Sequence, residues 1–425
     1  MSTAHPTSAA ATWARRALLV AFIVAMPVTG EFALGGKRMN LAASDLILPL
    51  GVAFLLWRAF QGRLVLPSLG LCCFTAFAIE ASLIANFSDT LAAKGLIGVA
   101  VETLKILSLW LQFYICVNAV ESRNDFKLAL KAWLLGSAGV SVIGIYGSLS
   151  YQMTGVANDY ALMFRAQGTL GDANLFASYL ALSIVLGILL WQIDQRARKW
   201  IVPVMAILAA GIFFSASRGT MMSLSCVLAL LAAISMTWRA RFIAAVSVFV
   251  VVAAVAAIPG RDDLLASTPY TERLATATTN VNDDAASDRK LLWDDAWERF
   301  RTSPFFGVGR GNFRPLDEPD PTQTGAVHDT FLGIASETGI LGVIAFALAF
   351  SRYAIALAID RWSSRGRRFP LATRVILCAL LILMLCGLTI SIENFRGVWI
   401  LIALMEAYRR LFGAYGLAPE YRVSS

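Results

Sequence analysis

The chain alternates between long apolar segments and short polar ones along almost its whole length. A membrane-spanning helix needs roughly 17 to 25 apolar residues, and about twelve segments meet this length. The predicted spans are residues 17–34, 41–57, 66–86, 95–118, 128–150, 174–193, 200–216, 220–237, 241–258, 330–357, 370–391 and 397–412. The pattern therefore predicts an all-α polytopic membrane protein of about twelve transmembrane helices.

The basic residues follow the same alternation. Lys and Arg gather in every second loop, at Arg15, Arg16, Arg58, Arg63, Arg123, Lys127, Lys131, Arg196, Arg198, Lys199, Arg239, Arg241, Arg361, Arg365, Arg367, Arg368, Arg409 and Arg410. These loops and both termini are predicted to be cytoplasmic, because basic loops stay on that side. The other loops are then external, at residues 35–40, 87–94, 151–173, 215–219, 259–329 and 392–396. The predicted organisation is helices 1 to 9 in residues 1–258, a long external loop in 259–329, and helices 10 to 12 with a cytoplasmic tail in 330–425.

The composition agrees with a membrane protein. Hydrophobic residues make up 58% of the chain and charged residues 15%, and the mean hydropathy of +0.66 excludes a water-soluble globule. The net charge of +8 resides in short loops, so it implies no nucleic-acid partner. All six cysteines fall in apolar segments, which leaves no thiol in the hydrophilic loops for a disulfide or a zinc site. The apolar run after Arg15-Arg16 could be a signal peptide, but a retained first span is favoured.

The long external loop contains two segments with a pattern of their own. Residues 287–302 predict an amphipathic helix that ends before Pro304, with an apolar stripe of Leu292, Ala296 and Phe300 beside Trp293 and Trp297. Its apolar face is expected to lie on the membrane surface or to cover a cavity between spans. The glycine-rich segment 307–313 lacks the Gly-Lys-Ser/Thr ending of a phosphate-binding loop, so it predicts a tight turn.

His328 stands where this loop runs back into an apolar segment, and the only other histidine, His5, lies in the N-terminal tail. An imidazole titrates near neutral pH, so at this position it is a candidate general base. The alternative is a hydrogen-bonded interface histidine. Asp329 or Thr330 is the expected cap of the helix that follows, and the positive end of that helix would keep His328 neutral.

Three arginines stand out on the predicted external side, where the positive-inside rule predicts few. Arg218 begins a span after a minimal turn, a position that suits an anion such as a diphosphate. Arg165 precedes another external helix start, with Asp172 or Asn174 as the expected cap. Arg289 begins the amphipathic helix. The alternatives are that Arg218 reaches lipid phosphates and that Arg289 is a solvated charge.

The acidic residues give weaker signals. Glu337 lies inside the span that follows His328, where a hydrogen-bonded structural carboxylate is favoured over a catalytic one. Glu102 and Lys105, three residues apart, are expected to form an internal ion pair in preference to a proton path. With one available histidine and no thiol outside the membrane, no metal and no cofactor is predicted.

Several of these segments together resemble the O-antigen ligase and polymerase superfamily. They are Phe214-Ser215-Ala216-Ser217-Arg218-Gly219, Trp293 followed by Phe306–Phe313, and His328-Asp329-Thr330-Phe331-Leu332 followed by Glu337–Gly342. The resemblance covers mainly residues 165–345, and the hydropathy fits throughout. It implies a GT-C-like architecture and a multi-pass protein of the bacterial inner membrane whose active site faces the periplasm.

The resemblance also implies an activity and the residues that perform it. Ligases of this type are glycosyltransferases that move a glycan from undecaprenyl diphosphate to a sugar hydroxyl of lipid A-core. The functional histidine then falls on His328, the essential arginines on Arg218, Arg289 and Arg165, and a late external acid on Glu393. The ligase motif has Asn after the histidine, whereas this chain has Asp329.

The expected reaction is metal-independent and inverting. His328 takes the proton of the acceptor hydroxyl, and the arginines offset the charge on the departing lipid diphosphate. Three alternatives stay open: a Wzy-type O-antigen or exopolysaccharide polymerase, glycan transfer to protein, and a polysaccharide transporter or flippase. The transporter is disfavoured because the sequence shows no pair of Gly- or Pro-broken helices in its two halves.

Overall fold

The computed structural model describes residues 9–34, 37–235, 284–316, 326–363 and 371–412, most of which are helical. Six of the described helical segments are long and apolar enough to cross a membrane. They are α5 (Phe87–Ala119), α6 (Arg123–Thr154), α7 (Ala173–Ile193), Gln195–Ser215, α9 (Arg218–Ser235) and Thr330–Ala356. Shorter apolar helices are α3 (Leu48–Phe60), α4 (Leu69–Ala85) and α15 (Leu371–Gly387). A helical, multi-pass membrane protein is therefore supported, whereas the number of spans, the sidedness and the GT-C-like architecture stay predictions.

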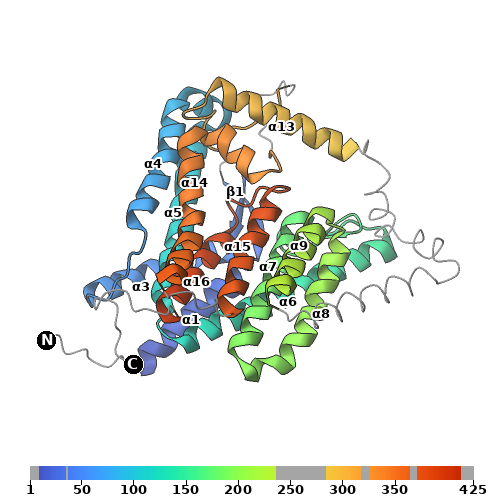
Figure 1. Cartoon of the computed structure of the whole chain (residues 1–425). Helices are drawn as coiled ribbons and strands as arrows, with labels where there is room; N and C mark the ends of the chain where they lie inside the picture. The colour runs from blue at the N-terminus through green and yellow to red at the C-terminus, as the bar shows by residue number, and fades with distance from the viewer. Residues whose placement is uncertain (1–8, 35–36, 236–283, 317–325, 364–370, 413–425) are drawn as a thin grey trace. The chain divides into compact units, whose positions relative to one another are not determined.

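The chain divides into two compact units, and the boundary falls within α6 (Figure 1). The first unit comprises residues 1–137, 289–368 and 387–425. The second comprises residues 138–288 and 369–386. Predicted site residues occur in both units.

The first unit is built around α5. Helices α3, α4 and α16 (Arg396–Phe412) pack on it, and α14 (Thr330–Ser363) packs on α4. The ring of Trp110 in α5 lies 4.6 Å from that of Trp399 in α16, centroid to centroid, and 5.7 Å from that of Phe113. Helix α1 (Ala9–Ala25) also packs on α5, and its Arg15 side chain pairs with the buried Asp125 at 2.9 Å. Aromatic packing and buried ion pairs thus fix the helices that carry the first unit's polar residues.

The first predicted span is wrong. Helix α1 ends at Ala25, and residues 29–34 form strand β1 (Thr29–Leu34), which pairs antiparallel with β2 (Lys37–Ala42). A short helix, α2 (Ala43–Leu46), follows. Pro27 disfavours helical backbone in the residue before it, and Gly30 weakens a helix further, so the apolar run cannot continue as one helix. The predicted external loop 35–40 is therefore mainly part of this hairpin.

Two helices are broken at glycines. Residues 87–94, predicted as an external loop, form the first part of α5, which breaks at Gly95 with φ 66°. Helix α14 breaks at Gly339 with φ 64°. Only a residue without Cβ adopts such a left-handed backbone at little cost. Helices broken at glycine therefore occur in both halves of the sequence, contrary to the prediction that disfavoured a transporter.

The second unit is built around α7, which packs on α8 (Arg198–Ser215) and α9. A one-turn 3₁₀ helix, η1 (Gln195–Ala197), joins α7 to α8. In the predicted external loop 151–173, strands β3 (Ala161–Leu162) and β4 (Arg165–Ala166) pair antiparallel. The predicted spans 174–193, 200–216 and 220–237 thus agree with α7, α8 and α9 within a few residues, while the predicted span 241–258 lies outside the described residues.

Candidate functional site

Arg218 is the first residue of α9, after a turn of two residues that follows α8. Ala216 in this turn has left-handed backbone, with φ 50°, which reverses the chain abruptly. The first N–H groups of a helix have no acceptor within the helix, and the helix dipole is positive there. The structure thus confirms that Arg218 is half-buried at the N-terminal end of an apolar helix.

Arg165 and Asn174 hold the turn that precedes Arg218. Arg165 Nε donates to the Ser215 carbonyl oxygen at 3.0 Å, and its Nη2 donates to Asn174 Oδ1 at 2.9 Å. The same amide oxygen accepts the Ser217 hydroxyl at 3.0 Å. The second unit therefore brings together three predicted residues that lie far apart in sequence, Arg165, Asn174 and Arg218.

The cap of α7 is Asp172. Its Oδ1 accepts the backbone N–H groups of Asn174 at 2.8 Å and Leu175 at 2.7 Å. Of the two cap candidates, Asp172 is thus correct. Because Asp172 satisfies the helix start, the Asn174 amide is available to the arginine and to the turn.

His328 immediately precedes the cap of α14. Asp329 Oδ1 accepts the N–H groups of Phe331 and Leu332, both at 2.8 Å, so Asp329 is the cap. Burial raises the pKa of the Asp329 carboxyl, and these two donors oppose the rise. His328 itself is half-buried and has left-handed backbone, with φ 54°. A left-handed non-glycine residue carries strain that the surrounding structure must hold, which often marks a functional position.

The start of α14 is tied to the segment before α16. The Thr330 hydroxyl donates to the Ile390 carbonyl oxygen at 2.7 Å and accepts the Ile392 N–H at 3.1 Å. Glu393 is the next residue after this contact. The first unit therefore places the predicted acid Glu393 beside the segment that anchors the helix following His328.

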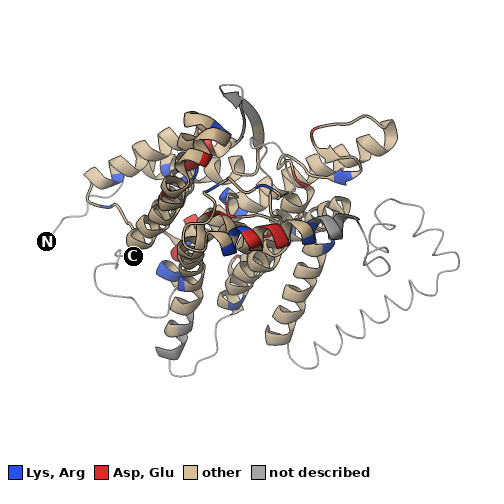
Figure 2. Ribbon diagram, turned by 90° about the horizontal axis from the view of Figure 1, so that it is seen from above, with Lys and Arg blue, Asp and Glu red and all other residues tan. Residues whose placement is uncertain are grey.

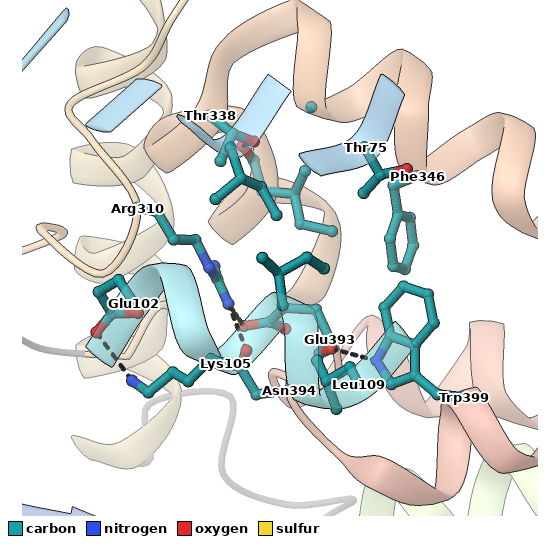
Figure 3. Close-up of a pocket in the computed structure, with 14 residues that line it drawn as sticks. Thr75, Glu102, Lys105, Leu109, Arg310, Thr338, Phe346, Glu393, Asn394 and Trp399 are labelled. Atoms are coloured by element: carbon teal, nitrogen blue, oxygen red, sulfur yellow. Dashed lines mark hydrogen bonds and ion pairs between the residues drawn. The ribbon is translucent and has the colours of Figure 1, made fainter. Parts of the chain in front are cut away.

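Arg310 is the functional candidate that sequence reasoning missed. It is buried and forms an ion pair with Glu337. Its Nη2 lies 3.4 Å from Glu393 Oε1 and 2.8 Å from Asn394 Oδ1, two residues that Figure 3 shows beside it. Burial alone would lower the pKa of Arg310, but Glu337, Glu393 and Glu102 outweigh it and the pKa is raised. Burial raises the pKa of Glu393, with Arg310 opposing and Glu337 adding to the rise.

Glu337 and Glu393 are therefore the anionic partners of Arg310. The interpretation of Glu337 as a structural carboxylate is supported by its ion pair. The signal that could have revealed Arg310 is a lone basic residue within the glycine-rich segment 307–313, on the side of the membrane where Glu393 was predicted. An arginine there needs a counter-charge once it is buried.

A cavity in the first unit opens beside this cluster. Figure 3 shows Arg310 and Lys105 on one side of it and Phe346 and Trp399 on the other. It is lined by Thr75, Ile79, Glu102, Lys105, Ile106, Leu109, Arg310, Ile334, Thr338, Gly342, Phe346, Glu393, Asn394 and Trp399. Glu102 Oε1 pairs with Lys105 Nζ at 2.8 Å and with Lys94 Nζ at 3.0 Å, as the predicted ion pair requires. Mutually paired charges next to apolar walls leave this cavity without a strong excess of either charge.

Helix α13 (Asp284–Thr302) is the predicted amphipathic helix. Its residue Ala296 forms a buried cluster with Phe313 and Val327, against which Leu292, Trp293 and Leu332 pack. The apolar face of α13 thus covers the segment just before His328, while acidic and basic residues follow one another along the helix (Figure 2). Arg289, in the first turns of α13, is half-buried. It belongs to the first unit with His328, Glu337 and Glu393, whereas Arg165, Asn174 and Arg218 belong to the second.

The described residues contain no group of three or more His, Cys, Asp or Glu side chains that could hold a metal ion. The prediction of a metal-independent reaction therefore stays a prediction.

Comparison with known proteins supports the resemblance. Residues 203–347 match the family model Wzy_C, described as O-Antigen ligase. No curated protein matches the chain. The matched segment contains the α8–α9 turn with Arg218, helix α13, the glycine-rich segment, His328 and Glu337. Members of this family are glycosyltransferase-like ligases and polymerases that act on lipid-linked glycans. Residues 203–347 are thus similar to the O-antigen ligase family.

Proposed function

We propose that the chain is an O-antigen ligase of the bacterial inner membrane. It transfers O-antigen polysaccharide from undecaprenyl diphosphate to a sugar hydroxyl of lipid A-core at the periplasmic face. One observation carries the proposal: the segment that matches the family contains both His328 at the start of α14 and Arg218 at the start of α9. Each polar residue stands at the N-terminal end of an apolar helix, where an anionic headgroup is favoured.

His328 is the general base of this reaction. Its imidazole takes the proton of the acceptor hydroxyl while the oxygen forms a bond to the anomeric carbon of the donor. The bond between that carbon and the diphosphate oxygen breaks, and undecaprenyl diphosphate leaves with the electron pair. Attack from the opposite face inverts the anomeric centre. One carboxylate oxygen of the adjacent cap Asp329 accepts two backbone N–H groups at the start of α14. The positive end of this helix favours the neutral imidazole, which is the form that accepts a proton.

Arg218 and Arg165 of the second unit and Arg289 of the first are the arginines that the resemblance assigns to offsetting the charge on the leaving diphosphate, in a reaction that needs no metal or other cofactor. Preorganised donors of this kind stabilise a developing anion without reorganisation during the reaction. The hydrogen bonds of Arg165 to the Ser215 carbonyl oxygen and the Asn174 amide oxygen orient its guanidinium. The substrates are the lipid-linked glycan and a lipid-anchored acceptor.

A polymerase is the nearest alternative. The Asp after His328 separates this chain from the ligase motif, but the structure gives Asp329 a capping role that Asn fulfils equally well. The departure from the motif therefore does not by itself favour a polymerase. The acceptor decides between the two activities.

The test uses the purified protein in lipid nanodiscs with undecaprenyl-diphosphate glycan. One reaction adds lipid A-core, a second adds only further donor, and a third adds a pilin-like protein. We expect glycan attached to lipid A-core. A longer lipid-linked glycan would establish a polymerase instead, and labelled protein would establish a protein glycosyltransferase.

The broken helices α5 and α14 justify one further arm, because such helices occur in transporters. Proteoliposomes loaded with donor report movement across the bilayer. Movement without any covalent product in the three reactions would overturn the proposal in favour of a flippase.

A further inference from the structure

The break in α14 is filled by another part of the chain. We call residues 303–313 the strap. Ile340 N–H, just after the break at Gly339, donates to the Pro304 carbonyl oxygen at 2.8 Å. The Ser336 carbonyl oxygen accepts Val308 N–H at 2.9 Å, and the Glu337 carbonyl oxygen accepts Gly309 N–H at 3.0 Å. The strap thus satisfies backbone groups that an uninterrupted helix would pair internally.

Glycines allow the two segments to touch. A Cβ on Gly307 would collide with the Glu337 backbone, and a Cβ on Gly339 would collide with the backbone of Phe305. Both glycines also have left-handed backbone, with φ 65° and 64°. The close contact therefore depends on glycine from each side.

Arg310 stabilises the contact between the strap and α14. Its backbone N–H donates to Ser82 Oγ of α4 at 3.1 Å, and its guanidinium binds Glu337, Glu393 and Asn394. One side chain therefore joins the strap, the half of α14 before the break, and the segment before α16. Arginine suits this position because its planar fork reaches several oxygens at once, which a lysine ammonium does not reproduce.

The strap also reaches the other end of the same half-helix. Its last residue, Phe313, is fully buried against Val327, the residue directly before His328. Thr330 is tied to residues 390 and 392, next to the acid that Arg310 binds. The short helix of residues 330–338 is thus held at both ends by the strap and by the segment 390–394.

We infer that Arg310 is a positioning residue for His328: through the strap, Glu337 and Glu393 it fixes the short helix whose start sets the direction of the imidazole. The inference rests on the proposed role of His328 as base. A base displaced by about 1 Å loses about 100-fold in rate even when its chemistry is unchanged. The left-handed backbone of His328 is consistent with a residue held from both sides.

The chain offers a direct readout of the imidazole. It contains only two histidines, so a His5→Ala background leaves one labelled histidine, His328. In protein labelled with ¹³C-histidine, the ring ε1 resonance and its pH titration report the surroundings of His328 without any activity assay. Arg310→Gln is compared with Arg301→Gln, an exposed arginine of α13 that pairs only at the surface, with Glu298.

We expect Arg310→Gln to shift the His328 resonance or split it, and to change its titration midpoint. The kcat of glycan transfer falls about 10- to 100-fold, while the KM for donor stays within about threefold, because substrate contacts are unchanged. Arg301→Gln leaves all four quantities at their original values. Arg310→Lys restores the charge without the fork and recovers only part of the rate.

If Arg310→Gln does not fold, Asn394→Ala replaces it, since this change removes a single acceptor of Arg310. A folded variant at either position with the resonance, titration and kcat of the parent overturns the inference. The positioning role of Arg310 and the proposed function can fail separately. If Arg310→Gln shifts the His328 resonance but the parent protein transfers no glycan to any acceptor, Arg310 positions His328 and the proposed function is wrong.

Discussion

Two arginines in this protein hold sharp chain reversals in different electrostatic settings. Arg165, in the second unit, donates to the Ser215 carbonyl oxygen and the Asn174 amide oxygen. Arg310, in the first unit, binds the carboxylates of Glu337 and Glu393 as well as the Asn394 amide. Both side chains fix a turn next to the end or break of an apolar helix.

The acceptors named here differ in charge: neutral oxygens for Arg165, carboxylates for Arg310. Bonds to neutral oxygens orient a guanidinium and preserve its attraction for an anion, whereas carboxylates cancel that attraction. Arg310 is therefore suited to holding the broken helix α14 in place, and Arg165 to orienting the α8–α9 turn beside Arg218. An arginine on the predicted external face is a candidate substrate contact only once its partners are known.

The largest expected effect comes from removing Arg310. Arg310→Ala leaves Glu337 and Glu393 buried without their counter-charge, and breaking a buried pair in this way costs about 3–5 kcal/mol of stability. Arg165→Ala removes bonds to neutral groups and costs about 1–3 kcal/mol. Unfolding midpoints in the same detergent measure both. Equal losses for the two variants would erase the distinction between the two sites.

Removing Arg218 tests the second unit by activity. Arg218→Ala is expected to lower kcat about 100- to 1,000-fold, the loss seen when one donor to a developing anion is removed, with little change in stability. The matched control is Arg196→Ala, an exposed arginine in the connection between α7 and α8. Initial rates of glycan transfer give the comparison. Wild-type kcat in Arg218→Ala would mean that this arginine does not contact the leaving group.

The cap of α14 gives a smaller effect. Asp329→Ala is expected to cost about 0.5–2 kcal/mol, since two backbone donors lose their acceptor. Asp329→Asn keeps an oxygen at the same place and should unfold within a few tenths of a kcal/mol of the parent. A product that changes from ligated lipid A-core to polymerised glycan in Asp329→Asn, or the reverse, would show that this residue also selects the acceptor.

The smallest effect concerns pH. Burial raises the pKa of Glu393 despite Arg310, so the folded protein keeps a proton that the unfolded chain releases above the ordinary glutamate value. Stability contributed by Glu393 therefore falls as pH rises from that value through the raised one. Glu393→Gln should flatten this part of the stability profile, measured by unfolding midpoints from acidic to neutral pH. A slope unchanged by the substitution would remove Glu393 as its source.

The features that the sequence could predict are local ones. Apolar segments long enough to span a membrane, the start of α9 at Arg218 and the amphipathic α13 follow from local periodicity and turn residues. The ion pair of Glu102 with Lys105 follows from helical spacing. Each of these features depends on residues close in sequence.

The missed features depend on distant partners. Gly339 breaks α14 because the strap supplies replacement hydrogen bonds, and nothing near Gly339 in the sequence reveals them. Arg310 could be assigned only once Glu337 and Glu393 were known to meet it. The hairpin of β1 and β2 was hidden because an apolar run of this length is compatible with either a helix or a strand.

The most direct test of the account is the kcat of glycan transfer to lipid A-core by His328→Ala, measured beside the parent protein across the pH range in which imidazole titrates. Loss of a well-placed general base is expected to lower kcat about 100- to 10,000-fold, and to abolish the fall in rate that the parent shows as imidazole becomes protonated. Unchanged unfolding midpoints would confirm that the variant is folded. Near-normal transfer by folded His328→Ala would contradict the assignment of His328 as the base.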